Sequence, residues 1–123
     1  AGKTCLVRSI VDGLGGDARD VSSPTFVLLQ NYAARLSIYH ADAYRIGSLT
    51  EFLDLGAEEW LGGDGVSVVE WGERVRDALP QDHMTIEVTI TGTTTRLFPI
   101  SSAGDQSSTL LRYLRDALPT STQ

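Results

Sequence analysis

Residues 1–16 read AGKTCLVRSIVDGLGG, and this stretch decides how the rest of the chain is interpreted. Apolar residues recur in it at helical spacing, at positions 6, 7, 10, 11 and 14. Two glycines follow, a signal that ends helices because glycine tolerates left-handed backbone. The stretch therefore predicts a helix over residues 3–14 that opens almost at the first residue.

The start of this helix has the residue types of a phosphate-binding loop. Glycine lets backbone N–H groups approach phosphate oxygens, and the positive end of a helix dipole favours anions. Lys3 can reach the β- and γ-phosphates of a nucleotide, and the Thr4 hydroxyl can ligate Mg²⁺. The complete motif has another glycine five residues before Gly2. Gly-Lys-Thr alone is short enough to occur by chance, so an ordinary helix start is the alternative for this feature.

Strands and further helices follow in an order typical of an α/β fold with a mixed sheet. Short apolar or alternating runs predict strands at residues 26–32, 36–41, 66–71, 86–90 and 95–101. Helical spacing and stop signals predict helices at residues 48–55, 57–61, 73–79 and 110–118. A strand leading directly into Ala1 would complete the sheet, so we expect that N-terminal strand to be missing here. We expect a single domain over residues 1–118 and a frayed tail over residues 119–123.

Composition limits the classes of partner. The chain has 123 residues, a formal net charge of -6 and one cysteine. An acidic surface repels nucleic acid, so we expect any RNA in the pathway to be held by a partner. The single cysteine, Cys5, excludes an internal disulfide and a thiolate metal site, which suits the cytoplasm. No apolar run approaches the ~20 residues that cross a bilayer, and we expect no membrane partner.

One acidic residue ends an apolar strand, where ligands bind in α/β sheets. Glu70 follows the run at residues 66–69 and precedes Trp71. A carboxylate there can hold Mg²⁺ directly or through water. The alternative is an acid that simply leaves the core where the strand ends. For Trp71 we start from a place in the core or at an interface.

A second acidic residue, Asp42, follows the apolar run at residues 36–41. Alternation places His40, Asp42 and Tyr44 on one side if the strand continues. A carboxylate near a phosphate site can orient or deprotonate an attacking water, and His40 could orient that carboxylate. The alternative is a satisfied polar cluster at a strand end, with Tyr44 serving in packing.

The segment Ser22-Ser23-Pro24-Thr25-Phe26 is rich in hydroxyl groups and stiffened by proline. Such a loop before a strand can act as a nucleotide-sensing switch that changes order with the γ-phosphate. A plain loop with good turn chemistry is the alternative.

The four features together resemble the TsaE family, the ATPase subunit of the bacterial system that makes threonylcarbamoyladenosine in tRNA. Their order is a Gly-Lys-Thr helix, a Ser-Pro-Thr loop, a His-x-Asp-x-Tyr-Arg strand end and a strand ending in Glu-Trp. The similarity runs from residue 1 to about residue 100. It implies a small P-loop NTPase-like, three-layer α/β fold with a mixed sheet.

The resemblance also implies a function. Family members bind ATP with Mg²⁺, hydrolyse it slowly alone, and act with TsaB and TsaD. TsaD transfers the threonylcarbamoyl group to adenosine 37 of tRNA, so the ATPase meets tRNA only through the complex. The ATPase subunit is needed for repeated turnover and not for the transfer itself.

Roles for individual residues follow from the same resemblance. Asp42 and Lys3 are the implied catalytic residues, and Thr4 and Glu70 are the implied Mg²⁺ ligands. The implied nucleotide-binding residues are Ala1, Gly2, Lys3, Thr4, Cys5, Thr25 and Trp71. Cys5 stands where a second threonine is frequent in the family, and Gly72 stands where proline is common.

Two other functions stay open beside the ATPase. One is a regulatory module in which bound ATP holds a partner and hydrolysis releases it. The other is a small-molecule kinase, disfavoured because the sequence shows no acceptor pocket or arginine-rich lid. Without the preceding strand and the first loop glycine, we expect the chain as it stands to bind ATP poorly.

Overall fold

The structure is a computed structural model that describes residues 3–21, 29–44 and 46–117. The chain forms two compact units, Ala1–Leu79 and Pro80–Gln123, called here the N-terminal and C-terminal units. The expected single domain over residues 1–118 stays a prediction, as does the tail, which lies outside the described residues. No helix in the described ranges has the length and apolar character to cross a membrane.

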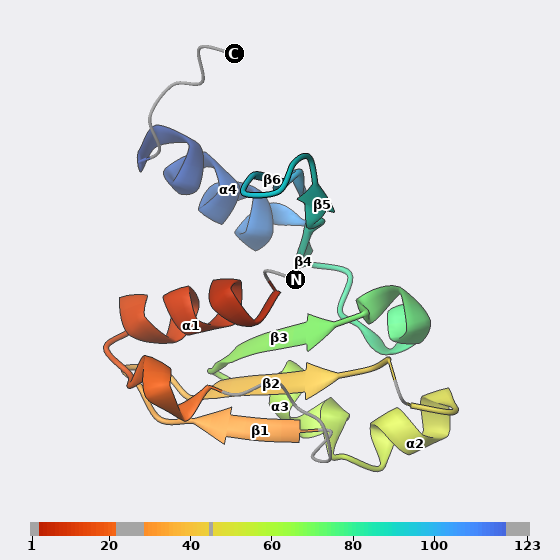
Figure 1. Ribbon diagram of the computed structural model, residues 1–123. Coiled ribbons are helices and arrows are strands. Elements are labelled where there is room, and N and C mark those ends of the chain that lie inside the picture. The colour runs from red at the N-terminus through yellow and green to blue at the C-terminus, as the bar shows by residue number, and fades with distance from the viewer. Residues whose placement is uncertain (1–2, 22–28, 45, 118–123) are drawn as a thin grey trace. The chain divides into compact units, whose positions relative to one another are not determined.

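A three-stranded mixed sheet forms the centre of the N-terminal unit. Strand β1 (Leu29–Tyr32) pairs antiparallel with β2 (Ile38–Asp42), which pairs parallel with β3 (Val66–Glu70). Figure 1 shows the arrows of β2 and β3 pointing the same way and that of β1 pointing back. This arrangement confirms the expected α/β class and mixed sheet.

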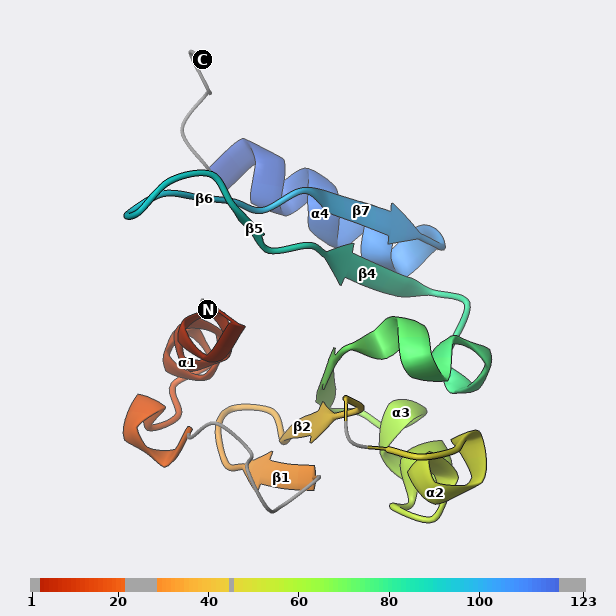
Figure 2. The same cartoon turned by 45° about the vertical axis from the view of Figure 1, so that its right-hand side comes forward.

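Helices cover both faces of this sheet, as in a three-layer fold. Helix α1 (Lys3–Gly13) packs on one face through Val7 and Val11, which are buried against Ile38 of β2. Helices α2 (Leu49–Leu53) and α3 (Ala57–Leu61) pack on the other face. Figure 2 shows the sheet between α1 and this pair of short helices.

The direction of α1 brings its first turn toward the carboxyl ends of β2 and β3. The Leu14 carbonyl, just after the helix, accepts the N–H of Arg35, which shortly precedes β2. The last turn of α1 therefore lies at the beginning of β2. A helix of 11 residues and a strand of 5 residues are both about 16 Å long. Helix α1 therefore runs back along the sheet, and Figure 1 shows its first turn on the side toward the carboxyl ends of β2 and β3.

The C-terminal unit consists of one helix on two short strand pairs. Strand β4 (His83–Ile86) pairs with β7 (Ile100–Ala103), and β5 (Thr89–Ile90) pairs with β6 (Arg96–Leu97). Helix α4 (Asp105–Ala117) contacts β7 and β4, and Figure 2 shows it lying along β7.

Several expected boundaries were wrong. The strand expected at residues 86–90 is two strands, because β4 ends at Ile86 and β5 begins at Thr89. The strand expected at residues 95–101 is likewise divided between β6 and β7. The helix expected at residues 73–79 is a 3-10 helix, η2 (Gly72–Ala78). A short 3-10 helix, η1 (Ala18–Asp20), lies in a stretch expected to be a loop.

The first turn of α4 is capped by a distant carboxylate. Asp82 accepts the backbone N–H groups of Gln106 and Ser107, at 2.9 and 2.8 Å. Hydrogen bonding from the Ser107 side chain and then from these N–H groups lowers the pKa of Asp82 below its ordinary 3.8. A lowered folded-state pKa means that the ionised form stabilises the unit above the unfolded pKa. That contribution disappears as pH falls through the folded pKa.

We therefore expect Asp82→Ala to loosen α4 at neutral pH but to have little effect well below pH 3.8. Hydrogen exchange of the α4 amides at neutral and acidic pH measures this difference. Asp116→Ala is the matched control, because Asp116 is an exposed acid in the last turn of the same helix. Equal loss of protection at both pH values would contradict the capping role.

Candidate functional site

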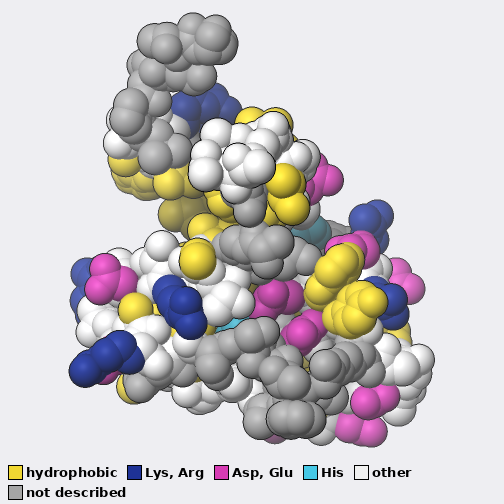
Figure 3. All heavy atoms as spheres, in the orientation of Figure 1, with side chains coloured by type: hydrophobic (Ala, Val, Ile, Leu, Met, Phe, Trp, Pro, Cys, Tyr) yellow, Lys and Arg dark blue, Asp and Glu magenta, His cyan; other side chains and the backbone are white. Residues whose placement is uncertain are grey.

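Two acidic residues meet at the carboxyl ends of parallel strands. Asp42 ends β2, Glu70 ends β3, and the two are direct partners in the register. Both side chains lie on the face that α1 covers. Side chains alternate along a strand, so Asp42 shares a face with Ile38 of β2 and Glu70 with Val68 of β3, and both apolar residues pack beneath α1. Both residues are half-buried, and Figure 3 shows acidic side chains gathered over β2 and β3. The sequence prediction that both acids lie at strand ends is confirmed in position.

A hydrogen-bonded chain crosses the sheet behind Glu70. His40 is fully buried, and its Nε2 lies 2.6 Å from Oε2 of Glu70. The other ring nitrogen, Nδ1, lies 3.0 Å from the Tyr32 hydroxyl, which also bonds with Gln30. The expectation that His40 orients Asp42 was therefore wrong, because the imidazole holds the glutamate of the neighbouring strand instead.

Asp42 is fixed by its own backbone. Its Oδ1 accepts the N–H of Tyr44 at 2.9 Å, a turn-forming bond typical of aspartate. The Ala43 N–H donates to the Glu70 carbonyl at 2.9 Å and ties the two strand ends together. Within the described ranges, Oδ2 of Asp42 and Oε1 of Glu70 have no hydrogen-bond partner. Each carboxylate is thus held by one oxygen and has the other available for a ligand.

An aromatic and cationic cluster lies directly after the two acids. The rings of Tyr44 and Trp71 are 5.0 Å apart and inclined by 48°, and the Arg74 guanidinium lies 5.0 Å from the Tyr44 ring centre. Trp71 is 39% and Tyr44 51% exposed. Because β2 ends at Asp42, Tyr44 does not continue its alternation, and it packs on Trp71 rather than beside His40. Trp71 has a φ of 60°, the one positive φ of a non-glycine residue among those described.

The remaining expected site residues belong to the start of α1 and to the loop before β1. Helix α1 begins at Lys3, with Thr4 half-buried and Cys5 exposed in its first turn. This turn contains no acidic residue, so nothing there offsets the positive end of the helix dipole. Ala1, Gly2, Thr25 and the Lys3 side chain lie outside the described part of the structure.

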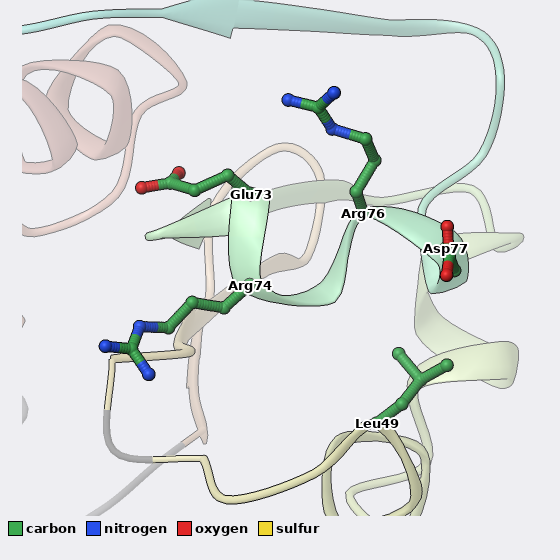
Figure 4. A pocket seen from close by; sticks show the side chains of 5 residues that line it. All are labelled: Leu49, Glu73, Arg74, Arg76 and Asp77. Carbon is green, nitrogen blue, oxygen red and sulfur yellow. The ribbon is translucent and has the colours of Figure 1, made fainter.

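A shallow hollow lies between α2 and η2, and neither of the two acids lines it. Leu49, Glu73, Arg74, Arg76 and Asp77 line it. Figure 4 shows that these side chains point in different directions rather than toward one centre. Metal binding at the strand ends needs ligands besides the two acids. Throughout the described residues, no three His, Cys, Asp or Glu side chains gather as a metal-binding group. A magnesium ion bound by Asp42 or Glu70 would therefore need further oxygen ligands, such as a hydroxyl, water or phosphate.

Sequence reasoning missed two participants, Tyr32 and Arg74. Tyr32 was counted only as the last residue of an expected strand, and Arg74 only as part of a short helix. Their roles depend on the pairing of β1 with β2 and on the turn after β3. The pattern Trp-x-x-Arg formed by residues 71–74 gave no local signal for Arg74. For Tyr32, the signal available was an aromatic residue in the strand next to the one that contains His40.

The fold and the strand-end acids define a mixed α/β protein with a polar site at the carboxyl edge of its parallel strands. A family model described as "Threonylcarbamoyl adenosine biosynthesis protein TsaE" matches residues 1–98. The chain belongs to the TsaE family. The earlier resemblance is thereby confirmed.

Individual relatives give the same result. The chain is 49% identical over 90 residues to the "tRNA threonylcarbamoyladenosine biosynthesis protein TsaE" of Treponema pallidum, covering 73% of this chain and 66% of that protein. It is 35% identical over 115 residues to the protein of the same name from Bacillus subtilis, covering 93% and 71%. A crystal structure of Bacillus subtilis YdiB superposes with a TM-score of 0.69 at 26% identity, covering 94% of this chain and 70% of that one. The present chain thus spans about two thirds of the length of these relatives.

Proposed function

We propose that this protein binds ATP with Mg²⁺ and hydrolyses it slowly, in support of threonylcarbamoyladenosine formation at adenosine 37 of tRNA. The proposal includes a P-loop at the start of α1, a cytoplasmic setting and action with TsaB and TsaD. One observation carries the ATPase part. Two carboxylates in register at the ends of parallel strands lie on the face of the sheet that α1 covers, and α1 begins at Lys3, directly after Gly2 in the sequence.

The residues present fit a nucleotide with a magnesium ion. The first turn of α1 has no acid to repel phosphate, and the Thr4 hydroxyl lies within that turn. Oε1 of Glu70 is available for the ion, directly or through water, while Oε2 is bound by His40. When bound, Mg²⁺ neutralises charge on the β- and γ-phosphates. Thr4 and Glu70 would hold it.

Two further residues act on the transferred phosphate and its attacking water. Lys3 neutralises negative charge that develops on the phosphate oxygens. Asp42 accepts a hydrogen bond from the water through Oδ2, and its Oδ1 stays bound to the Tyr44 N–H. Because the backbone fixes the carboxylate, the water is oriented at little further cost in entropy.

Lys3→Ala is expected to weaken Mg·ATP binding by about 10- to 100-fold, the loss that follows from removing charged hydrogen bonds to phosphate. Calorimetry on the full-length protein measures the dissociation constant. Arg19→Ala is the matched control, since Arg19 is an exposed cation paired with Asp17 at 2.8 Å. Unchanged affinity in Lys3→Ala, or a folded wild-type protein that binds no nucleotide even with TsaB and TsaD present, would overturn the ATPase proposal.

A regulatory binding module is the second candidate, favoured by the exposed cluster of Tyr44, Trp71 and Arg74. Tyrosine, tryptophan and arginine are the residues that most often dominate protein interfaces. In this reading ATP holds the partner and hydrolysis releases it. Loss of partner binding in Trp71→Ala, with ATP hydrolysis by the isolated protein intact, would support this second candidate.

A further inference from the structure

The buried Tyr32–His40 pair has no role in the function proposed so far. These two residues and Glu70 come from three different strands, β1, β2 and β3, and form one hydrogen-bonded chain. His40 lies opposite Gln30 on one side and Val68 on the other. Tyr32 and Glu70 are each two residues further along their strands, so the chain crosses the sheet diagonally on the face under α1.

The surroundings fix the imidazole tightly. The His40 side chain is 0% exposed, and both of its ring nitrogens are engaged. The Tyr32 ring centre lies 5.8 Å from that of His40, so the two rings are also in contact. A histidine needed only for packing could be replaced by an apolar residue without loss, whereas here the ring joins a buried hydroxyl to a carboxylate that reaches the surface. The Glu70 side chain is 12% exposed, and of these hydrogen-bonded residues it is the one at the carboxyl ends of the parallel strands β2 and β3.

We propose that His40, held by Tyr32, is a positioning residue that fixes Glu70 for a magnesium ion bound with the nucleotide. This inference rests on the function proposed above. The imidazole occupies Oε2 and turns the carboxylate so that Oε1 is the oxygen presented to a ligand. Groups that orient a metal-binding side chain from behind affect metal affinity by about 10- to 100-fold when they are removed.

The test compares how strongly Mg²⁺ tightens the binding of a non-hydrolysable ATP analogue. Its dissociation constant is measured by calorimetry in excess Mg²⁺ and again in EDTA, on the full-length protein. The ratio of the two constants isolates the contribution of the metal. A general loss of structure changes both constants together, whereas loss of positioning changes only the constant measured with Mg²⁺.

Two substitutions of His40 separate its two hydrogen bonds. The amide nitrogen of glutamine comes near the place of Nε2, and that of asparagine near the place of Nδ1. His40→Asn is therefore expected to lower the Mg²⁺ ratio by about tenfold or more, while His40→Gln keeps most of it. Tyr32→Phe removes one hydroxyl from the buried pair without removing its ring. This variant is expected to lower the Mg²⁺ ratio by a smaller factor. It provides the test of the positioning role if the His40 variants fail to fold.

Matched controls come from the C-terminal unit. His83 is a half-buried histidine whose Nδ1 bonds with the Pro80 carbonyl at 2.7 Å, and Tyr113 is 71% exposed on α4. His83→Asn and Tyr113→Phe are expected to leave the ratio unchanged. A second readout needs no nucleotide. Imidazole ¹⁵N spectra should show a His40 signal that shifts in Tyr32→Phe and in Glu70→Gln.

The outcomes distinguish the inference from the function on which it rests. Wild-type protein that binds no analogue would overturn both. A Mg²⁺ ratio that falls in Glu70→Gln but stays at the wild-type value in His40→Asn and Tyr32→Phe would overturn the positioning role alone. An equal fall in His40→Gln and His40→Asn would also overturn it, because the glutamine would then fail to replace the Nε2 bond.

Discussion

Asp42→Asn is expected to slow ATP hydrolysis by about 10²- to 10⁴-fold, the usual contribution of a general base. Mg·ATP affinity should stay close to that of the wild type. The amide oxygen of asparagine still accepts the Tyr44 N–H, so the turn after β2 keeps its bond. The change removes the charge of the carboxylate and puts an NH2 group, which cannot accept a proton, in the place of Oδ2, the oxygen proposed to bind the attacking water. Single-turnover hydrolysis and calorimetry on the full-length protein give the two quantities.

Asp54→Asn is the control for this substitution, since Asp54 is an exposed aspartate at the end of α2 on the other face of the sheet. Unchanged hydrolysis in Asp42→Asn would exclude Asp42 as the base. The same comparison also separates the two candidate functions. Lost turnover with intact binding to TsaD favours the ATPase, and lost binding to TsaD in Asp42→Ala favours the regulatory module.

Phe52→Ala is expected to lower the free energy of unfolding by about 3–5 kcal/mol, as large aromatic-to-alanine changes in cores do. Phe52 is 0% exposed, and its ring meets the edge of Trp60 with centres 5.8 Å apart. It is also the one fully buried side chain of the five-residue helix α2. Losing it removes the side chain that anchors that helix in the core cluster. Thermal unfolding should show a fall of about 10–20 °C in Tm.

Leu49→Ala is the control on the same helix, because Leu49 is 37% exposed and at the first position of α2. Its effect should be a fraction of that of Phe52→Ala. A fall in Tm of similar size in both variants would show that the burial of Phe52 does not set it apart from an exposed position of the same helix. The cavity argument for Phe52 would then be wrong.

Sequence patterns predicted the N-terminal unit better than the C-terminal unit. Periodicity located α1 and β3 closely, because Val7 and Val11 repeat at helical spacing and residues 66–69 are apolar except for Ser67. In the C-terminal unit, Ile86, Val88 and Ile90 alternate as if in one strand. Pro99 on the opposite segment has no N–H to donate, and its carbonyl accepts the N–H of Glu87, so the ladder of donors is interrupted there. The start of α4 was also missed. The helix begins at Asp105, before its apolar residues, and the group that caps it, Asp82, is too distant in sequence to be recognised from a local pattern.

The candidate site shows the same limit. The strand-end positions of Asp42 and Glu70 follow from local patterns, yet their register required the pairing of β2 with β3. The partner of His40 could not be read from spacing. Aspartate is short, and Asp42 is engaged by its own turn, whereas the longer glutamate side chain reaches back from the neighbouring strand. Local sequence patterns therefore identified candidate residues, whereas their contacts depend on how the strands pair in the sheet.

The unequal burial of the two tryptophans gives the protein its own optical probe. Trp60 is 5% exposed between Tyr39 and Phe52, so its emission reports on the core beneath the sheet. Trp71 is 39% exposed and directly follows Glu70, so we expect its emission to change when a ligand binds beside it at the strand ends. Replacing Trp60 by phenylalanine leaves a single indole in the chain, since the sequence has only two. Events at the strand ends could then be followed in real time without a dye.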